Sequence, residues 1–240
     1  EKISAERICA ELEKLILSDN PDKLIEAYNL GITKVVLPEF DAMMECKQDT
    51  PYHMYNVGEH TIKVMENVEK TRVMRFAALL HDVAKPDVHT FDTRSHFKGH
   101  AIAGVEKANK IMRRLKMDNK TIGLVKRLVA CHDDRPGEHG RSEEKVRRSV
   151  HKIGKDIYPL YLQLVNADFA GNPSKSFFFR TRWCLSQYLF GNINRLLCIF
   201  GIKIRTDFHG IIFGQHRTAN HYLAVEIFCA EGSDGFFHTL

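Results

Sequence analysis

The sequence predicts an all-α fold, a bundle of helices, for residues 1–180. Apolar side chains recur at intervals of three and four residues through this stretch, which is the spacing of one face of a helix. Few segments alternate apolar and polar residues with the period of two that a half-buried strand requires. The chain has 240 residues and can bury a sizeable core as one domain, or as one domain plus an appendage.

Two helices are expected before residue 45. The first begins near Ser4, and four apolar residues follow on one face: Ile8, Leu12, Leu15 and Ile16. The second begins at Pro21, because proline is favoured at the first position of a helix. Its buried side comprises Leu24, Ile25 and Tyr28.

Two further helices lead to a group of polar residues. Apolar residues from Val57 to Val68 mark a third helix, with His60 near its first turn. The stretch from Val73 to Leu80 marks a fourth, which delivers His81 and Asp82 to its C-terminal end.

The second half of the bundle follows a polar connection from Pro86 to Lys98, which contains His89 and His96. Helical spacing returns twice after this connection and again towards residue 170, and Ser142 is a good capping residue for another helix start. The expected helices are Ala101–Leu115, Ile122–Ala130, a helix from Ser142-Glu143-Glu144, and Tyr158–Phe169.

Residues 181–240 differ from the rest of the chain. Between Thr181 and Val225 the only acidic residue is Asp207, and the local signals conflict. The stretches Cys198–Ile204 and Ile211–Gly214 are either strands or apolar sequence without a consistent pattern. We expect an atypical tail that is disordered or has arisen from a shifted reading frame.

Composition excludes a membrane-spanning helix, since no run approaches the roughly 18 apolar residues that one needs. No apolar signal segment follows Glu1, and the six cysteines show no CxxC spacing, so we expect a cytoplasmic protein with reduced thiols. The chain also lacks an initiator methionine, which indicates a piece of something longer. A net charge of +5 permits a phosphate or nucleic-acid partner without demanding one.

The pair His81-Asp82 is the most informative local feature. It follows packed leucines, and a carboxylate in such surroundings needs compensation, for which a divalent cation is a strong partner. Companions at or near other predicted helix ends could complete the site: His60, His100, His132 and Asp168. Imidazole and carboxylate together suit Zn, Mn, Fe or Ni, with Mg as a further candidate.

Each of these residues also has an ordinary structural interpretation. His60 could be an exposed helical residue, and His81 could cap the last carbonyls of its helix. Asp82 could pair with Lys85 or Arg75.

The remaining members are equally open when taken singly. His132 could belong to a surface charge cluster with Asp133 and Asp134, and Asp168 could be an ordinary residue near a helix C-terminus. Four other histidines lack this placement and are expected in solvent: His53, His89, His139 and His151.

Taken together, these residues and their flanks resemble the HD superfamily of metal-dependent phosphohydrolases. The likeness is greatest to the HD region of bacterial CCA-adding tRNA nucleotidyltransferases and poly(A) polymerase relatives, and it covers roughly residues 1–180. The stretches that carry it are Ile3–Ile8, Val36–Glu39, Tyr52–Thr61, Ala77–Pro86, His96–His100, Leu128–His132 and Ala167-Asp168.

The resemblance implies that His60, His81, Asp82 and Asp168 ligate a divalent metal. It implies that His100 and His132 bind a second ion or the scissile phosphate, with Lys85 near its oxygens. The implied activity is that of a phosphomonoesterase or a 2′,3′-cyclic phosphodiesterase acting on nucleotides or RNA ends.

The chain departs from that family in three respects. It has no DxD pair, and its Gly232-Ser233 lies at the wrong end for nucleotide addition, so we expect it to follow a missing nucleotidyltransferase head. Ala84 stands where glycine is usual, which we expect to be harmless at a helix end. The third departure is the tail.

The alternative function is a non-catalytic, tRNA-binding body segment of a CCA-adding enzyme. Exposed basic residues are common on any helix face, but ten that lie close together in the sequence could neutralise phosphates: Lys110, Arg113, Arg114, Lys116, Lys120, Lys126, Arg127, Lys145, Arg147 and Arg148. Phe177, Phe178 and Phe179 could stack on bases. The expected divisions are a helical segment at 1–45, the HD domain at 46–180 and the tail at 181–240.

Overall fold

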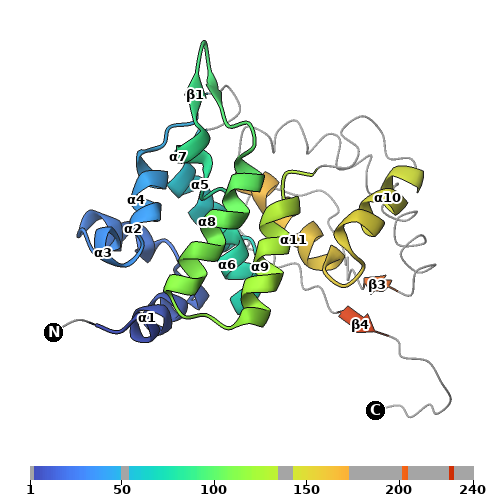
Figure 1. Cartoon of the computed structure of the whole chain (residues 1–240), viewed down its shortest axis with the longest axis horizontal. Coiled ribbons are helices and arrows are strands. Elements are labelled where there is room, and N and C mark those ends of the chain that lie inside the picture. Colours follow the sequence, from blue (N-terminus) through green and yellow to red (C-terminus); the bar gives the residue numbers. More distant parts are fainter. Residues whose placement is uncertain (1–2, 50–53, 135–142, 173–201, 205–226, 230–240) are drawn as a thin grey trace, which may run out of the picture. The chain divides into compact units, whose positions relative to one another are not determined.

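The computed structural model describes residues 3–49, 54–134, 143–172, 202–204 and 227–229. The chain divides into two compact units, Glu1–Phe179 and Arg180–Leu240. Helices make up most of the described part of the first unit, which confirms the all-α prediction (Figure 1).

Local capping residues explain where several helices begin. Ser4, Thr71 and Asp118 each accept a hydrogen bond from the backbone N–H three residues later, which satisfies an otherwise unpaired donor. The helices are α1 (Ala5–Leu17), α2 (Lys23–Asn29), α3 (Thr33–Val36), α4 (Pro38–Glu45), α5 (Val57–Glu66), α6 (Arg72–Leu80), α7 (Lys85–Val88), α8 (His100–Arg114), α9 (Asn119–Cys131), α10 (Glu143–Ile153) and α11 (Tyr158–Ala170).

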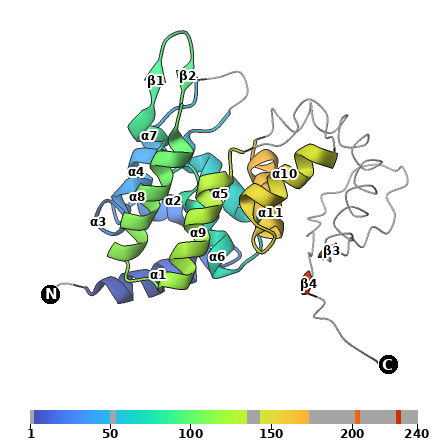
Figure 2. The same ribbon diagram turned by 45° about the vertical axis from the view of Figure 1, so that its right-hand side comes forward.

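The core of the first unit surrounds α6. Every residue of this helix from Met74 to Leu80 is buried, because α1, α5, α9 and α11 all contact it. Apart from Arg75, the buried residues of this helix are apolar, and each fully buried Phe or Leu side chain contributes about 1.5–3 kcal/mol. The helices α8 and α9 lie side by side in both views (Figures 1 and 2). The C-terminal end of α6 therefore lies in the interior of the bundle.

Two details differ from the sequence-based expectation. The polar connection from Pro86 to Lys98 contains α7 and an antiparallel hairpin of β1 (Thr90–Phe91) and β2 (Ser95–His96). Elements of two to four residues are too short to show a periodic pattern, so they could not be predicted from the sequence. The second helix begins at Lys23, not at Pro21, because residues 21 and 22 form a turn.

In the second unit, β3 (Ile202–Ile204) pairs antiparallel with β4 (Ile227–Cys229), with Lys203 opposite Phe228. Of the stretch 198–204, which was expected to be either a strand or irregular, residues 202–204 form a strand. The rest of the tail, with the expectation of disorder or a shifted frame, lies outside the described residues, as do Phe177–Phe179, His53, His139 and Ser142. Among the described helices, none has the length and apolar character needed to cross a membrane.

Candidate metal centre

The ends of five helices converge on one buried cluster. His60 lies in the first turns of α5, His81 directly follows α6, His100 opens α8, His132 directly follows α9, and Asp168 lies in the last turn of α11. Together with Asp82 and Lys85, every one of these residues is buried. The structure thus brings together all seven predicted site residues, whose chemical roles stay a prediction.

Three of the histidine rings are oriented by the same kind of hydrogen bond to the backbone. In each, Nδ1 lies within hydrogen-bond distance of the backbone carbonyl three residues earlier. A carbonyl can only accept, so Nδ1 carries the hydrogen and Nε2 presents its lone pair to the cluster. The distances are 2.7 Å from His81 to Ala78 O, 2.8 Å from His100 to Phe97 O and 2.7 Å from His132 to Val129 O.

His60 reaches the cluster from a firmly capped helix. Asn56 caps α5 by accepting from the Glu59 N–H at 2.8 Å, and the Glu59 carboxylate accepts from the Asn56 N–H at 3.2 Å. His60 is 1% exposed, which excludes the alternative of an exposed helical residue. Its Nε2 lies 2.9 Å from Asp168 Oδ1, since α11 packs against α5.

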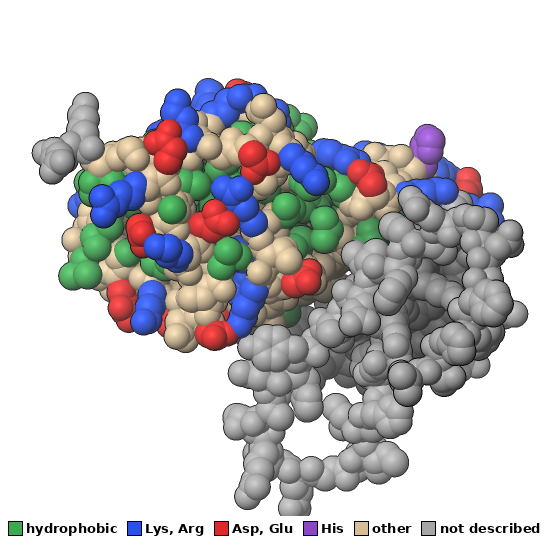
Figure 3. Space-filling model, turned by 90° about the horizontal axis from the view of Figure 1, so that it is seen from below, with side chains coloured by type: hydrophobic (Ala, Val, Ile, Leu, Met, Phe, Trp, Pro, Cys, Tyr) green, Lys and Arg blue, Asp and Glu red, His purple; other side chains and the backbone are tan. Residues whose placement is uncertain are grey.

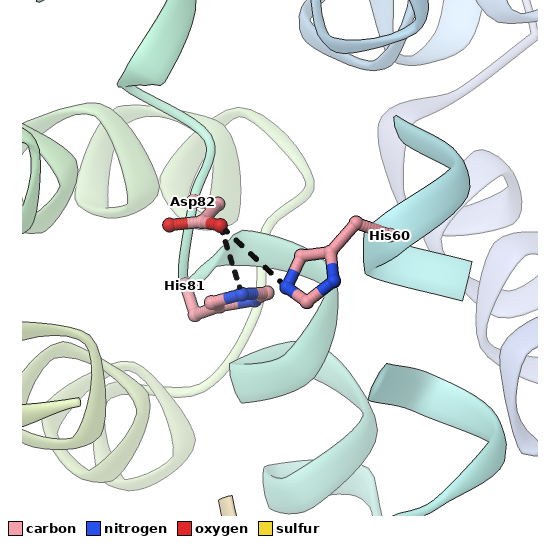
Figure 4. A group of neighbouring side chains, drawn as sticks. All are labelled: His60, His81 and Asp82. Atoms are coloured by element: carbon pink, nitrogen blue, oxygen red, sulfur yellow. Dashed lines mark ion pairs between the residues drawn. The ribbon is translucent and has the colours of Figure 1, made fainter. Parts of the chain in front are cut away.

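Asp82 lies at the centre, and its Oδ2 oxygen serves one group of partners. This oxygen is 3.1 Å from His81 Nε2 and 3.9 Å from His60 Nε2. Dashed lines mark both pairs in Figure 4. It also lies 2.6 Å from Lys85 Nζ, so the predicted pairing of Asp82 with Lys85 is present. His60, His81 and Asp82 together form a set of atoms that could hold a metal ion.

The Oδ1 oxygen of Asp82 faces a second group. It lies 3.4 Å from His100 Nε2 and 3.5 Å from His132 Nε2, and these two nitrogens are 3.1 Å apart. With both Nδ1 atoms protonated, this position gathers two lone pairs and a carboxylate oxygen. Such a set of acceptors needs a proton or a cation among them.

The ionisation of the cluster agrees with a cationic partner. Burial by itself would raise the pKa of Asp82, but the charges of His81 and Lys85 hold it well below its ordinary value. Burial would lower the pKa of His81, and the adjacent Asp82 carboxylate raises it instead. At His100 burial prevails over the attraction of Asp82 and lowers the pKa.

Gln48 is a member of the site that the sequence did not reveal. It lies in the loop after α4, is 4% exposed, and its Oε1 accepts a hydrogen bond from Lys85 Nζ at 2.8 Å. Its Nε2 donates to Tyr55 O at 3.3 Å, which fixes the orientation of the amide. A single polar residue in a loop has no periodic neighbours, so no sequence signal could have found it.

Comparison with known proteins is consistent with this geometry. Residues 50–163 match the family model of the HD domain. The chain contains an HD domain. Residues 1–44 match a second model, described as the probable RNA and SrmB-binding site of polymerase A.

Curated relatives match about half of the chain. The multifunctional CCA protein of Neisseria meningitidis serogroup A is 32% identical over 133 residues, 53% of this chain and 32% of the relative. That of Actinobacillus pleuropneumoniae serotype 5b is 32% identical over 124 residues, 48% of this chain and 30% of the relative. The chain thus spans about a third of the length of these relatives, to which it is distantly homologous. The domain divisions at residues 45 and 180 stay predictions.

Two smaller expectations about the HD domain can be compared with the structure. Ala84 has φ −95° and ψ −1°, which any residue adopts, so the usual glycine is not needed for the backbone there. His89 and His151 are exposed, as expected. His89 is not isolated, however, because it contacts Ser95 and Phe97.

Proposed function

We propose that the HD domain is a metal-dependent phosphohydrolase, a phosphomonoesterase or 2′,3′-cyclic phosphodiesterase acting on nucleotides or RNA ends. The observation that carries the proposal is the surplus of acceptors around Asp82. Asp82 is a buried carboxylate with four imidazole Nε2 atoms within 3.9 Å, those of His60, His81, His100 and His132. The set of imidazole nitrogens and carboxylate oxygens fits Mn, Ni, Zn or Fe, and less well Mg.

In this proposal His60, His81, Asp82 and Asp168 hold the ion. A bound divalent ion supplies Lewis-acid chemistry: it lowers the pKa of a coordinated water and offsets charge on phosphate oxygens. His60 and Asp168 come from α5 and α11, so the packing of these two helices sets the geometry of this side.

His100 and His132 better suit a second cation than the scissile phosphate. Their Nε2 atoms present lone pairs, and phosphate oxygens are also acceptors, so neutral rings would repel a phosphate placed between them. A cation near these nitrogens would share Asp82 with the first position through Oδ1. Two ions clamping one phosphoester is an established arrangement for hydrolysis.

Lys85 and Asp82 have distinct roles in the proposed reaction. The Lys85 ammonium, held between Asp82 and Gln48, can donate to a phosphate oxygen and offset the charge that develops on phosphorus oxygens. Asp82 orients the attacking water and can accept its proton. Both groups are buried, so their electrostatic effect is stronger than it would be in water.

The experiment is an assay of the purified chain on a nucleoside 2′,3′-cyclic phosphate and on a phosphomonoester, with Mn²⁺, Ni²⁺ or Zn²⁺. Asp82→Ala should abolish turnover. Asp156→Asn is the matched control, since this carboxylate is exposed and pairs with Arg127 away from the cluster. Full activity in Asp82→Ala, or no metal-dependent turnover in wild type, would refute the proposal.

The second candidate function, a non-catalytic tRNA-binding segment, is favoured by the match of residues 1–44 to an RNA-binding model. The charge of residues 1–44 does not favour binding to RNA phosphates, because this segment holds nine acidic and five basic residues. Two of the basic residues after Lys110 already form ion pairs within the protein: Arg114 pairs with Glu39, and Arg127 pairs with Asp156. Figure 3 shows basic side chains interspersed with acidic ones over the face seen from below.

Salt-sensitive tRNA binding without turnover would support this candidate over the hydrolase. Lys110 and Arg113 are exposed on α8, so a Lys110→Glu, Arg113→Glu double variant tests the basic span directly. Weaker binding with a shallower salt dependence would locate the contact there. Unchanged binding would place it elsewhere.

A further inference from the structure

An aromatic stack connects the metal centre to the surface. The rings of His89 and Phe97 lie nearly parallel, at 18°, with their centroids 5.0 Å apart. The Phe97 centroid lies 5.3 Å from Lys85 Nζ, and Lys85 in turn contacts Asp82. His89 is exposed, whereas Phe97 is partly buried, so a run of direct contacts leads from the buried carboxylate to an accessible imidazole ring.

The His89 ring is fixed although it is exposed. Its Nε2 is hydrogen-bonded to Ser95 Oγ at 2.9 Å, across the β1–β2 hairpin. Ser95 is buried, and its Oγ and N–H both bond the backbone of Asp49, at 3.2 and 3.3 Å. A ring held in this way loses little conformational freedom when a ligand packs on it, which favours binding.

We propose that His89, supported by Phe97, stacks on the base of a nucleotide whose phosphoester lies at the metal centre. The inference rests on the proposed hydrolase function and adds the residue that would hold the base of its substrate. Imidazole and phenyl rings are common stacking partners of unpaired bases, and stacking tolerates any base because every base has a π-face. Lys85 contacts both Phe97 and Asp82, so it joins the stack to the metal centre.

The test compares two substrates with the same cyclic phosphodiester ring, adenosine 2′,3′-cyclic phosphate and glycerol 1,2-cyclic phosphate, of which only the first has a base. His89→Ala should raise KM for the adenosine substrate about tenfold, within the range measured for loss of one base stack. KM for the glycerol substrate should change by less than about twofold, and kcat for both should be kept, since only uniform binding is lost. An equal effect on both substrates would overturn the proposal.

Two further variants separate stacking from damage to the hairpin. His89→Phe keeps an aromatic face but loses the bond to Ser95, and it should retain adenosine binding. If it loses binding as severely as His89→Ala, the ring face is not the binding element. Phe91, 61% exposed on the same hairpin, is the rival stacking residue, and Phe91→Ala should leave KM unchanged. An increase in KM there, with none in His89→Ala, would also overturn the proposal.

Failure of the proposed function can be told apart from failure of this inference. Adenosine 3′-monophosphate binding, measured by calorimetry, requires no turnover. If wild type hydrolyses neither substrate, the hydrolase proposal fails, and the calorimetry still decides the stacking. Weaker binding in His89→Ala than in wild type supports the stack, and equal binding refutes it.

Discussion

Metal binding should stabilise the wild-type HD domain against heat, and Asp82→Asn should abolish that stabilisation. Asp82 is the only residue shared by the two groups of ligand atoms found among the described residues. Its Oδ2 serves the first group and its Oδ1 the second, so one substitution removes an oxygen ligand from both. Asparagine keeps the size of the side chain but loses the charge on which a divalent ion depends.

The size of the effect follows from linkage. An ion that binds only the folded state stabilises it by about 2.7 kcal/mol when its free concentration is about 100 times Kd. For a unit of this size each kcal/mol shifts Tm by about 2–4 °C, so we expect a shift of roughly 5–11 °C in wild type. His132→Gln removes a ligand from the second group alone and should give an intermediate shift.

The assay is thermal unfolding of protein freed of metal by a chelator, with and without added Mn²⁺. Manganese is preferred to zinc because zinc also binds the cysteines of the unfolded chain, which would reduce the shift. Asp156→Asn, with its exposed carboxylate, should keep the wild-type shift. A full shift in Asp82→Asn would show that Asp82 is not a ligand, and the geometric argument for both positions would then be wrong.

Three further substitutions test the packing and the charges of the bundle. A Cβ on Gly58 would lie 2.4 Å from Met44 Sδ and 3.0 Å from Met44 N, so Gly58→Ala should destabilise by about 1–3 kcal/mol in denaturant unfolding. Gly123 in α9 has open space around it, and Gly123→Ala should stabilise by about 0.5–1 kcal/mol. Glu39 is partly buried, and its two bonds to Arg114, both 2.7 Å, hold the pKa of Glu39 below 4.5. Glu39→Gln should therefore cost about 0.5–1 kcal/mol at neutral pH, because Arg114 is partly exposed. The difference should be lost as the pH falls through the lowered pKa of Glu39, where the wild-type carboxylate becomes protonated in the folded state. A difference that persists in stronger acid would contradict the ion pair.

Local sequence signals were sufficient for the helices that matter to the site, and insufficient for the parts that connect them. The start of α1 at Ser4 and the placement of His81 after α6 could be predicted because a capping residue or an apolar period specifies them within a few positions. The hairpin of β1 and β2 could not, since strands of two residues are too short to carry a pattern. Gln48 was missed for a related reason: its burial depends on the contact of α4 with α7, which no local window contains.

The capping and the metal-ligand interpretations of the helix-end histidines turn out to be compatible. At the C-terminal end of a helix the last carbonyls lack partners, and His81 and His132 each use Nδ1 to satisfy one. That same bond fixes the tautomer and turns the Nε2 lone pair away from the helix, towards whatever faces its end. A sequence can therefore indicate that a helix presents an imidazole acceptor, but only tertiary packing determines what it meets. Here several such ends meet one buried carboxylate, and the excess of acceptors that results is the physical basis for expecting a cation.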